Sequence, residues 1–297
     1  MAYLQPQRPE KVTVPGLRRS KERGEPLVCL TAYDYPTARV IDEAGTDVIL
    51  VGDSLANVVL GHNNTIGVTV EQMEHHTRAV RGGVSRALLV ADMPYGSYHT
   101  GADDAARNAL RLIKAGAEAV KLEGGRERAE IVRRLVAEEI PVMAHIGLTP
   151  QSVHKLGGNR RQGKTASAAR RLIEDAEMLE EAGAFSIVLE LVPRELARVI
   201  TERVSIVTIG IGAGSACDAQ IMVLHDLVGL SFSKPLRHVR QYADLRGVLT
   251  DAVTRYAEDV RAGSFPADSE SFALAPEELA ALQEEPAARD ASLLDPS

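Results

Sequence analysis

The stretch DVILVGD, residues 47–53, is a short run of branched apolar residues that ends in an acid. Near-continuous Val, Ile and Leu without polar alternation is typical of a strand buried on both faces, as in a parallel sheet. Similar runs recur along the chain, at 27–34, 86–93, 119–125, 141–147, 186–192, 205–212 and 221–229. The sequence therefore predicts eight buried parallel strands.

Amphipathic stretches separate the runs, and several of them end in Ala-Gly or Gly-Gly, as helices often do. Eight strands that alternate with helix-sized connections over about 230 residues predict a closed (β/α)₈ TIM barrel. An open, doubly wound sheet is the alternative, because the order of the strands cannot be read from the pattern. A last helix is expected over about 236–262.

We expect one catalytic barrel domain, 1–263, with a short N-terminal extension, followed by a flexible acidic tail, 264–297. The tail holds eight acidic residues and one arginine, which accounts for the whole net charge of −7. The neutral barrel therefore lacks the basic surface that nucleic acid needs. No apolar run approaches the ~18 residues of a membrane span. Two cysteines, Cys29 and Cys217, are too few for a disulfide framework, which favours a cytoplasmic protein.

The segment GNRRQGKT, 158–165, satisfies the G-x-x-x-x-G-K-[ST] pattern of a nucleotide-binding loop. Such a loop works between a strand that leads straight into it and a helix that begins at its end. Here the last apolar run stops about ten residues earlier, and Arg160 and Arg161 fill the loop. A mobile flap on the barrel rim is therefore favoured over a nucleotide-hydrolysing site.

Acidic residues end several of the apolar runs, and these acids are Asp53, Asp92, Glu123 and Glu190. Lys121 lies two residues before Glu123, so both would point to the same face of a strand. His145 lies at a similar height on the next run. Because the carboxyl ends of barrel strands surround one rim, we expect these side chains to converge there.

Each of these residues has a structural alternative. Asp53 or Asp92 alone could be the N-cap of the following helix. Lys121 and Glu123 could form a buried ion pair without further function, and His145 could be a satisfied core histidine. Clustered carboxylates, however, repel one another unless a cation or a proton intervenes. Two or three carboxylates without cysteine favour Mg²⁺, with Mn²⁺ or Co²⁺ as substitutes.

An ordered set of motifs resembles the ketopantoate hydroxymethyltransferase family. The motifs include VGDSLANVVLGH, VADMPYGSY, AVKLEGG and AHIGLTPQSVHKLGG, and the resemblance spans roughly residues 26–266. It implies a (β/α)₈ barrel that transfers a hydroxymethyl group from 5,10-methylenetetrahydrofolate to 3-methyl-2-oxobutanoate (α-ketoisovalerate). The product would be 2-dehydropantoate (ketopantoate), in pantothenate and coenzyme A biosynthesis. Members of the family usually form homo-oligomers, often decamers.

The resemblance also implies roles for individual residues. Asp53 and Asp92 would bind one Mg²⁺ per subunit, and Glu123 would join that metal site directly or through water. The residues that would hold the substrate are Asp53, Ser54, Asp92, Lys121 and His145. Glu190 would be the catalytic base that forms a magnesium-stabilised enolate from the keto acid.

The chain departs from the family pattern at Asn159, where an aromatic residue is usual, and in the segment 62–70. Both changes concern the loops and folate binding more than the chemistry. Two other functions stay open. One is a Mg²⁺-dependent α-keto-acid aldolase or lyase that uses the same enolate chemistry, and the other is a non-catalytic barrel that binds a keto acid.

Overall fold

Eight parallel strands close into a barrel in the order of the sequence, within the residues that the computed structural model describes, 10–158, 160–232 and 236–284. The strands are β1 (Leu27–Thr31), β2 (Val48–Val51), β3 (Leu88–Asp92), β4 (Ala119–Glu123), β5 (Val142–Gly147), β6 (Ser186–Glu190), β7 (Val207–Ile211) and β8 (Ala219–Met222). Strand β1 pairs with both β2 and β8, which closes the barrel. The predicted (β/α)₈ barrel is confirmed, and the open-sheet alternative is wrong.

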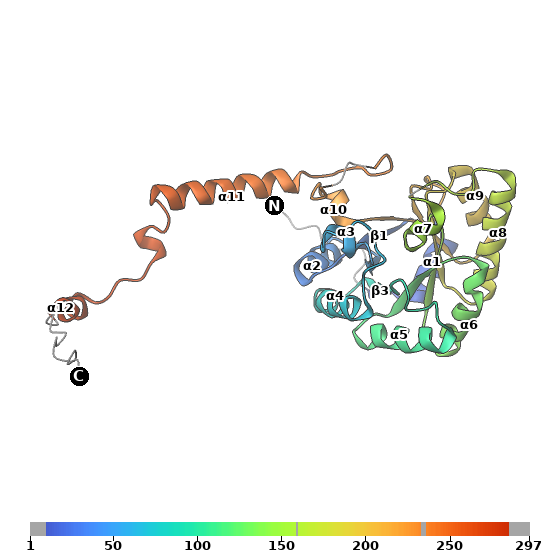
Figure 1. The fold of residues 1–297 in the computed structure, drawn as a ribbon, viewed down its shortest axis with the longest axis horizontal. Coiled ribbons are helices and arrows are strands. Elements are labelled where there is room, and N and C mark those ends of the chain that lie inside the picture. Colours follow the sequence, from blue (N-terminus) through green and yellow to red (C-terminus); the bar gives the residue numbers. More distant parts are fainter. Residues whose placement is uncertain (1–9, 159, 233–235, 285–297) are drawn as a thin grey trace, which may run out of the picture. The chain divides into compact units, whose positions relative to one another are not determined.

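Helices cover the outside of the strands (Figure 1). The longer helices of this layer are α2 (Tyr35–Glu43), α4 (Val70–Gly83), α5 (Ala102–Lys114), α6 (Ala129–Ala137), α8 (Ala166–Glu181) and α9 (Arg194–Arg203). Helix α1 (Val14–Glu22) precedes the first strand, and α3 (Leu55–Val58) is a short helix after β2. Side chains cap several of these helices, as Thr69 and Gln72 do in the capping box of α4, because the first backbone N–H groups of a helix need acceptors.

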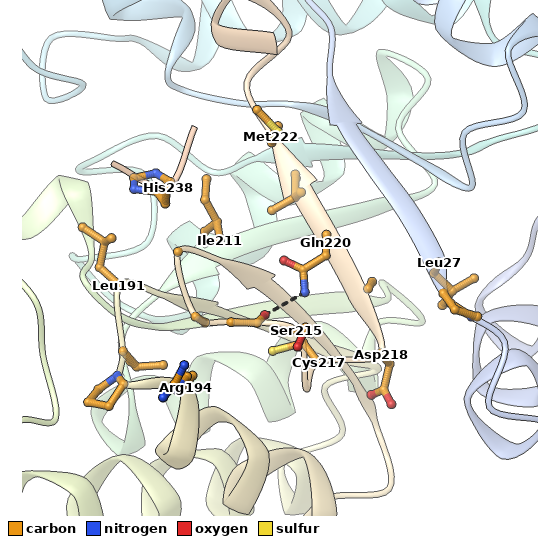
Figure 2. A pocket seen from close by; sticks show the side chains of 18 of the residues that line it. Leu27, Leu191, Arg194, Ile211, Ser215, Cys217, Asp218, Gln220, Met222 and His238 are labelled. Atoms are coloured by element: carbon orange, nitrogen blue, oxygen red, sulfur yellow. Dashed lines mark hydrogen bonds between the residues drawn. The ribbon is translucent and has the colours of Figure 1, made fainter. Parts of the chain in front are cut away.

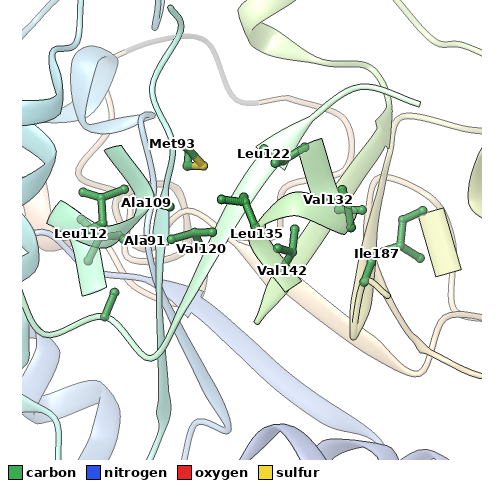
Figure 3. Packing of buried hydrophobic residues seen from close by; sticks show 14 of the residues in the cluster. Ala91, Met93, Ala109, Leu112, Val120, Leu122, Val132, Leu135, Val142 and Ile187 are labelled. Atoms are coloured by element: carbon green, nitrogen blue, oxygen red, sulfur yellow. The ribbon is translucent and has the colours of Figure 1, made fainter. Parts of the chain in front are cut away.

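Two apolar clusters hold the barrel together. Outward-facing strand residues pack against the helices, and Figure 3 shows Val120 and Leu122 of β4 in one cluster with Leu135 of α6. Inward-facing residues, such as Val90 and Met143, fill the barrel interior. Because successive residues of a strand point to opposite faces, each inward row continues to the side chains at the carboxyl end of its strand.

The end of the barrel differs from the prediction. The run 221–229, predicted as a strand, is divided between β8 and the short helix α10 (Leu224–Leu227). Apolar composition without alternation is shared by buried strands and buried helices, so the run does not reveal the change. The last long helix, α11 (Leu245–Ala262), begins at Leu245 rather than near Leu236.

The chain separates into two compact units, Met1–Asp244 and Leu245–Ser297. The second unit contains α11, the 3₁₀ turn η3 (Asp268–Glu270) and α12 (Pro276–Glu284). The division into a barrel domain, 1–263, and a flexible tail, 264–297, stays a prediction, and Asn159 and residues 285–297 lie outside the described residues. None of the described helices combines the length and the apolar character that crossing a lipid bilayer requires.

The segment 158–165 lies in a different setting from a nucleotide-binding loop. After β5 come the 3₁₀ turn η2 (Pro150–Ser152) and the short helix α7 (Val153–Leu156). The described residues before Gly158 therefore do not supply the strand that the nucleotide interpretation requires. Thr165, the last residue of the pattern, is the N-cap of α8, and its hydroxyl accepts a hydrogen bond from Ala168 N at 3.2 Å.

Candidate active site

Three strand ends bring charged side chains to one rim of the barrel. Asp92 ends β3, Glu123 ends β4 and Glu190 ends β6. The strand register places Lys121 opposite Asp92 and His145 opposite Glu123. Apart from Glu190, these residues are almost fully buried, with 2–4% of their surface exposed. The structure thus brings together the side chains that the sequence pattern predicted to converge.

Asp53 joins this group from the neighbouring strand end. It follows β2, and its backbone N–H donates to Asp92 Oδ2 at 2.9 Å. Ser54 is the N-cap residue of α3 and Gly101 is that of α5, so neither aspartate caps a helix. The N-cap alternative is therefore wrong for both. The hydroxyl of Ser54 lies 2.8 Å from that of Tyr33, within hydrogen-bond distance.

Lys121 lies between two carboxylates. Its Nζ is 2.9 Å from Asp92 Oδ1 and 3.9 Å from Glu123 Oε1, so Asp92 is the nearer partner. Burial lowers the pKa of Lys121, but the charges of Asp92, Glu123 and Asp53 outweigh burial and raise this pKa above its ordinary value. Lys121 is therefore a permanent cation in the floor of the site.

His145 connects Glu123 to Glu190. Its Nδ1 is 3.5 Å from Glu123 Oε1, and its Nε2 is 3.3 Å from Glu190 Oε2, although Nε2 makes no aligned hydrogen bond among the described residues. Burial and the charge of Lys121 lower the pKa of His145, but the two glutamates outweigh them and raise it to about 9. The charged imidazolium in turn helps to lower the pKa of Glu123 against the effect of burial.

The charged residues at this rim form what we call the acid cluster: Asp53, Asp92, Lys121, Glu123, His145 and Glu190. The acid cluster carries more negative than positive charge. Burial, Asp92 and Glu123 together raise the pKa of Asp53 well above its ordinary value, and Lys121 and Gln151 only partly offset them. Asp92 Oδ1 has the Lys121 ammonium at 2.9 Å but no aligned hydrogen bond in the described part of the chain. A divalent cation would offset the excess negative charge, so the donor set fits a hard, oxygen-preferring metal.

The described residues contain no group of three or more His, Cys, Asp or Glu side chains that is already arranged around a metal position. Mg²⁺ does not require such a cage, because proteins commonly hold it with one or two carboxylates and leave the other positions to water and substrate oxygens. A pair of aspartates, Asp53 and Asp92, is therefore compatible with this ion, whereas a zinc centre would need more protein ligands.

Two residues of this cluster could not be found from strand ends. Gln151, from the turn η2, donates through Nε2 to Asp53 Oδ2, and Tyr98, between β3 and α5, donates to Gln151 Oε1. Both residues lie in loops without hydrophobic periodicity. The sequence shows only that each residue is polar and lies within a motif that resembles the family. That information does not distinguish a buried side chain from a solvated one.

A close contact between two strands sets the position of Glu190. Gly147 pairs with Glu190 across β5 and β6, and a Cβ at Gly147 would lie 2.3 Å from the carbonyl oxygen of Glu190. Leu191, the next residue, has a φ of 47°, which is rare for a residue with a side chain. Its N–H donates to Ile211 O, and its carbonyl accepts from Gln162 N.

A large cavity of about 1500 Å³ borders the cluster at Leu191 without including it. In Figure 2, Leu191 and His238 lie on one side of this cavity and Leu27 on the other. None of the charged rim residues described above lines the cavity. The acid cluster, rather than this larger space, is the candidate active site, because buried titratable groups that perturb one another are typical of catalytic centres.

Comparison with known proteins agrees with these observations. The sequence profile of the family described as ketopantoate hydroxymethyltransferase matches residues 11–268. The chain is 53% identical over 274 residues to a 3-methyl-2-oxobutanoate hydroxymethyltransferase of Koribacter versatilis (strain Ellin345), covering 92% of this chain and 93% of that protein. It is 59% identical over 248 residues to the enzyme of the same name from Pyrobaculum islandicum, covering 84% and 94%.

Solved structures resemble the fold at much lower identity. A phosphonopyruvate hydrolase complex with oxalate and Mg²⁺ has a TM-score of 0.56 at 14% identity, covering 92% of this chain and 95% of that one. A 2,3-dimethylmalate lyase has a TM-score of 0.56 at 19% identity, covering 93% and 96%. At such identities the likeness shows a common barrel fold and nothing about activity.

Proposed function

The chain belongs to the ketopantoate hydroxymethyltransferase family, and we propose that it transfers a hydroxymethyl group from 5,10-methylenetetrahydrofolate to 3-methyl-2-oxobutanoate, giving 2-dehydropantoate. The observation that carries this proposal is the buried excess of carboxylates around Lys121 at the carboxyl ends of the strands. In a (β/α)₈ barrel this rim is where catalysis takes place.

Asp53 and Asp92 would hold Mg²⁺, and Glu123 would contact it directly or through water. When bound, the ion would act as a Lewis acid that draws charge toward the keto oxygen of the substrate and makes the neighbouring C–H more acidic. Lys121 would compensate the charge of the substrate carboxylate, and Ser54 would add a hydroxyl hydrogen bond. The burial of the three acids and of Lys121 would exclude water and strengthen each electrostatic contact.

Glu190 would accept the proton from the carbon next to the keto group. Its side chain is 16% exposed, against 3% for Glu123, so it is the glutamate of this cluster that substrate reaches from the rim. His145, whose Nε2 is 3.3 Å from Glu190 Oε2, would orient the Glu190 carboxylate. The electron pair released at the substrate carbon would form the new C–C bond to the one-carbon unit as one of the two C–N bonds that join this unit to the folate breaks. Water would then displace the second nitrogen and leave the hydroxyl group on the transferred carbon. Tetrahydrofolate would leave with the substrate proton and one proton from water on its two nitrogens.

The cavity beside Leu191 supports the folate part of the proposal. Four cationic side chains line it, and the described residues give none of them an ion-pair partner: Arg161, Lys164, Arg237 and Arg240. The glutamyl tail of a folate is anionic and would be attracted to these charges. The loop from Leu148 to Thr165 would act as a flap over the bound molecules.

Further parts of the proposal concern the setting of the enzyme. We expect a homo-oligomer, a decamer by resemblance to the family, that works in the cytoplasm on pantothenate synthesis. We expect binding to neither nucleic acid nor a membrane, since residues 1–263 carry no net charge by sequence.

The test is formation of 2-dehydropantoate from 3-methyl-2-oxobutanoate and 5,10-methylenetetrahydrofolate. Turnover should stop with a chelator and return when Mg²⁺ is added in excess. Turnover with a free aldehyde but not with the folate would replace the transferase by the aldolase or lyase alternative. Binding of the keto acid without any turnover would favour the non-catalytic barrel.

A further inference from the structure

Gln151 makes hydrogen bonds to two carboxylates of the acid cluster, Asp53 and Glu123. Its side-chain Nε2 donates to Asp53 Oδ2 at 2.9 Å and to the carbonyl oxygen of Met93 at 3.0 Å. Its backbone N–H donates to Glu123 Oε2 at 3.0 Å. Gln151 is only 4% exposed, so these bonds form away from bulk water.

Tyr98 fixes the orientation of the Gln151 amide. The Tyr98 hydroxyl accepts the backbone N–H of Glu123 at 3.2 Å and lies 2.5 Å from Gln151 Oε1. Its own proton is therefore free to go to Oε1. Both partners of Nε2 are oxygens that accept, and the partner of Oε1 donates, so the amide has one orientation that satisfies all of its groups.

These hydrogen bonds determine which oxygens of Asp53 and Glu123 remain available to other partners. Gln151 engages Oδ2 of Asp53 and Oε2 of Glu123, which leaves Oδ1 and Oε1 to face other partners. A metal ligand must point at the ion, and residues that hold ligands in this way commonly change metal affinity 10- to 100-fold when they are replaced.

We infer that Gln151 is a positioning residue for the metal site and that Tyr98 holds it in place. The inference rests on the proposed magnesium site. Gln151 belongs to the turn η2, near the beginning of the loop from Leu148 to Thr165. Its hydrogen bonds therefore also attach this part of the loop to Asp53 and Glu123.

The test is direct binding of Mn²⁺, followed by its electron paramagnetic resonance signal, to metal-free protein. Gln151→Met keeps the length of the side chain but removes the amide, and it should weaken Mn²⁺ binding about 10-fold. Tyr98→Phe should weaken it in the same direction by about 3-fold, because the amide keeps its bond to Asp53 but loses its fixed orientation. Tyr98→Phe also carries the test if Gln151→Met does not fold.

The matched control is Gln72→Met, in the capping box of α4. It also loses a side-chain hydrogen bond, the one that Gln72 Oε1 accepts from Thr69 N, but it should bind Mn²⁺ as the unaltered protein does. Equal Mn²⁺ affinity in the unaltered protein, Gln151→Met and Tyr98→Phe would overturn the inference and leave the proposed function intact. An unaltered protein that binds no Mn²⁺ would overturn both.

Discussion

Asp42 and Asp53 are both buried aspartates, 3% and 4% exposed, in opposite situations. Asp42, at the end of α2, accepts hydrogen bonds from the backbone N–H groups of Ser85, Arg86 and Ala87 and from the Ser85 hydroxyl. These residues precede β3, so Asp42 lies at the amino-terminal end of the barrel. Asp53, at the carboxyl end, accepts a hydrogen bond from Gln151 and lies among other carboxylates.

The two pKa shifts express this difference. Burial alone would raise the pKa of Asp42, but its hydrogen bonds outweigh burial and lower it below the ordinary value of 3.8. Burial, Asp92 and Glu123 raise the pKa of Asp53 well above the same value. A buried acid whose oxygens all accept hydrogen bonds stabilises the fold. Buried acids that lie close together destabilise one another, and a bound cation or substrate would relieve this repulsion.

The largest effect is expected at the edge of the crowded cluster. Glu190→Gln should slow the exchange of the substrate C–H with deuterated solvent about 1000-fold, because a positioned base contributes on the order of 10²–10⁴. Exchange is measured by proton resonance with Mg²⁺ and without folate, alongside keto-acid binding. Glu177→Gln, an exposed glutamate paired with Arg203, is the control, and undiminished exchange in Glu190→Gln would remove Glu190 from the role of base.

Asp42→Asn should destabilise the fold without changing the chemistry. The new amide would place an NH₂ group against backbone donors, which leaves buried N–H groups unsatisfied and costs about 2–4 kcal/mol. The free energy of unfolding is measured in urea. Asp103→Asn, at a carboxylate that is 78% exposed, should change it by less than about 0.5 kcal/mol. If Asp42→Asn lost activity at full stability, the division of roles between the two ends of the barrel would be wrong.

Asp53→Asn should have the opposite effect on stability. In metal-free protein it removes an acid whose ionisation is disfavoured by burial and by its neighbours, so the melting temperature at neutral pH should rise by about 2 °C or more. Binding of Mn²⁺ should be lost in the same variant. A lower melting temperature in the presence of chelator would mean that Asp53 is a stabilising acid of the same kind as Asp42.

The pH dependence gives the smallest and sharpest contrast. The folded-state pKa of Asp42 is lowered, so its stabilising contribution is complete above about pH 4 and disappears as the pH falls through the lower folded value. The folded-state pKa of Asp53 is raised, so its destabilising contribution is absent below about pH 4 and grows as the pH rises.

The test is to measure the free energy of unfolding of metal-free protein in urea at pH values from about 3 to about 8. The difference between Asp42→Asn and the unaltered protein should shrink at the acidic end. The gain in Asp53→Asn should shrink there too, and it should be the only one of the two that still changes above about pH 5. Parallel curves for the two variants would contradict the contrast.

The sequence predicts the barrel and the charged residues of the rim for one physical reason. In a buried parallel strand an acid is most easily accommodated at the end, so Asp92, Glu123 and Glu190 mark both the strand ends and the faces on which they lie. Lys121 and His145 then follow from register and alternation. The roles that the family resemblance gives to these residues stay predictions.

The remaining features depend on tertiary contacts that have no local pattern. Gln151 and Tyr98 lie in loops, where a buried polar residue and a solvated one look alike in sequence. Apolar residues continue from β8 into α10, so the end of that strand could not be read from composition. The segment 158–165 is the reverse case: it matches the local pattern of a nucleotide loop without the tertiary setting of one, and the sequence already favours a flap over that interpretation.

The contact between Gly147 and the carbonyl of Glu190 limits how this enzyme can be redesigned. Main-chain atoms of two adjacent strands meet there with no side chain between them. A side chain at position 147 would therefore clash with the backbone of Glu190, and no change of rotamer could relieve that clash. An engineer who wants a wider acceptor range should therefore leave these two strand ends untouched. Variation in the rim loops can reshape the entrance while Glu190 keeps its place.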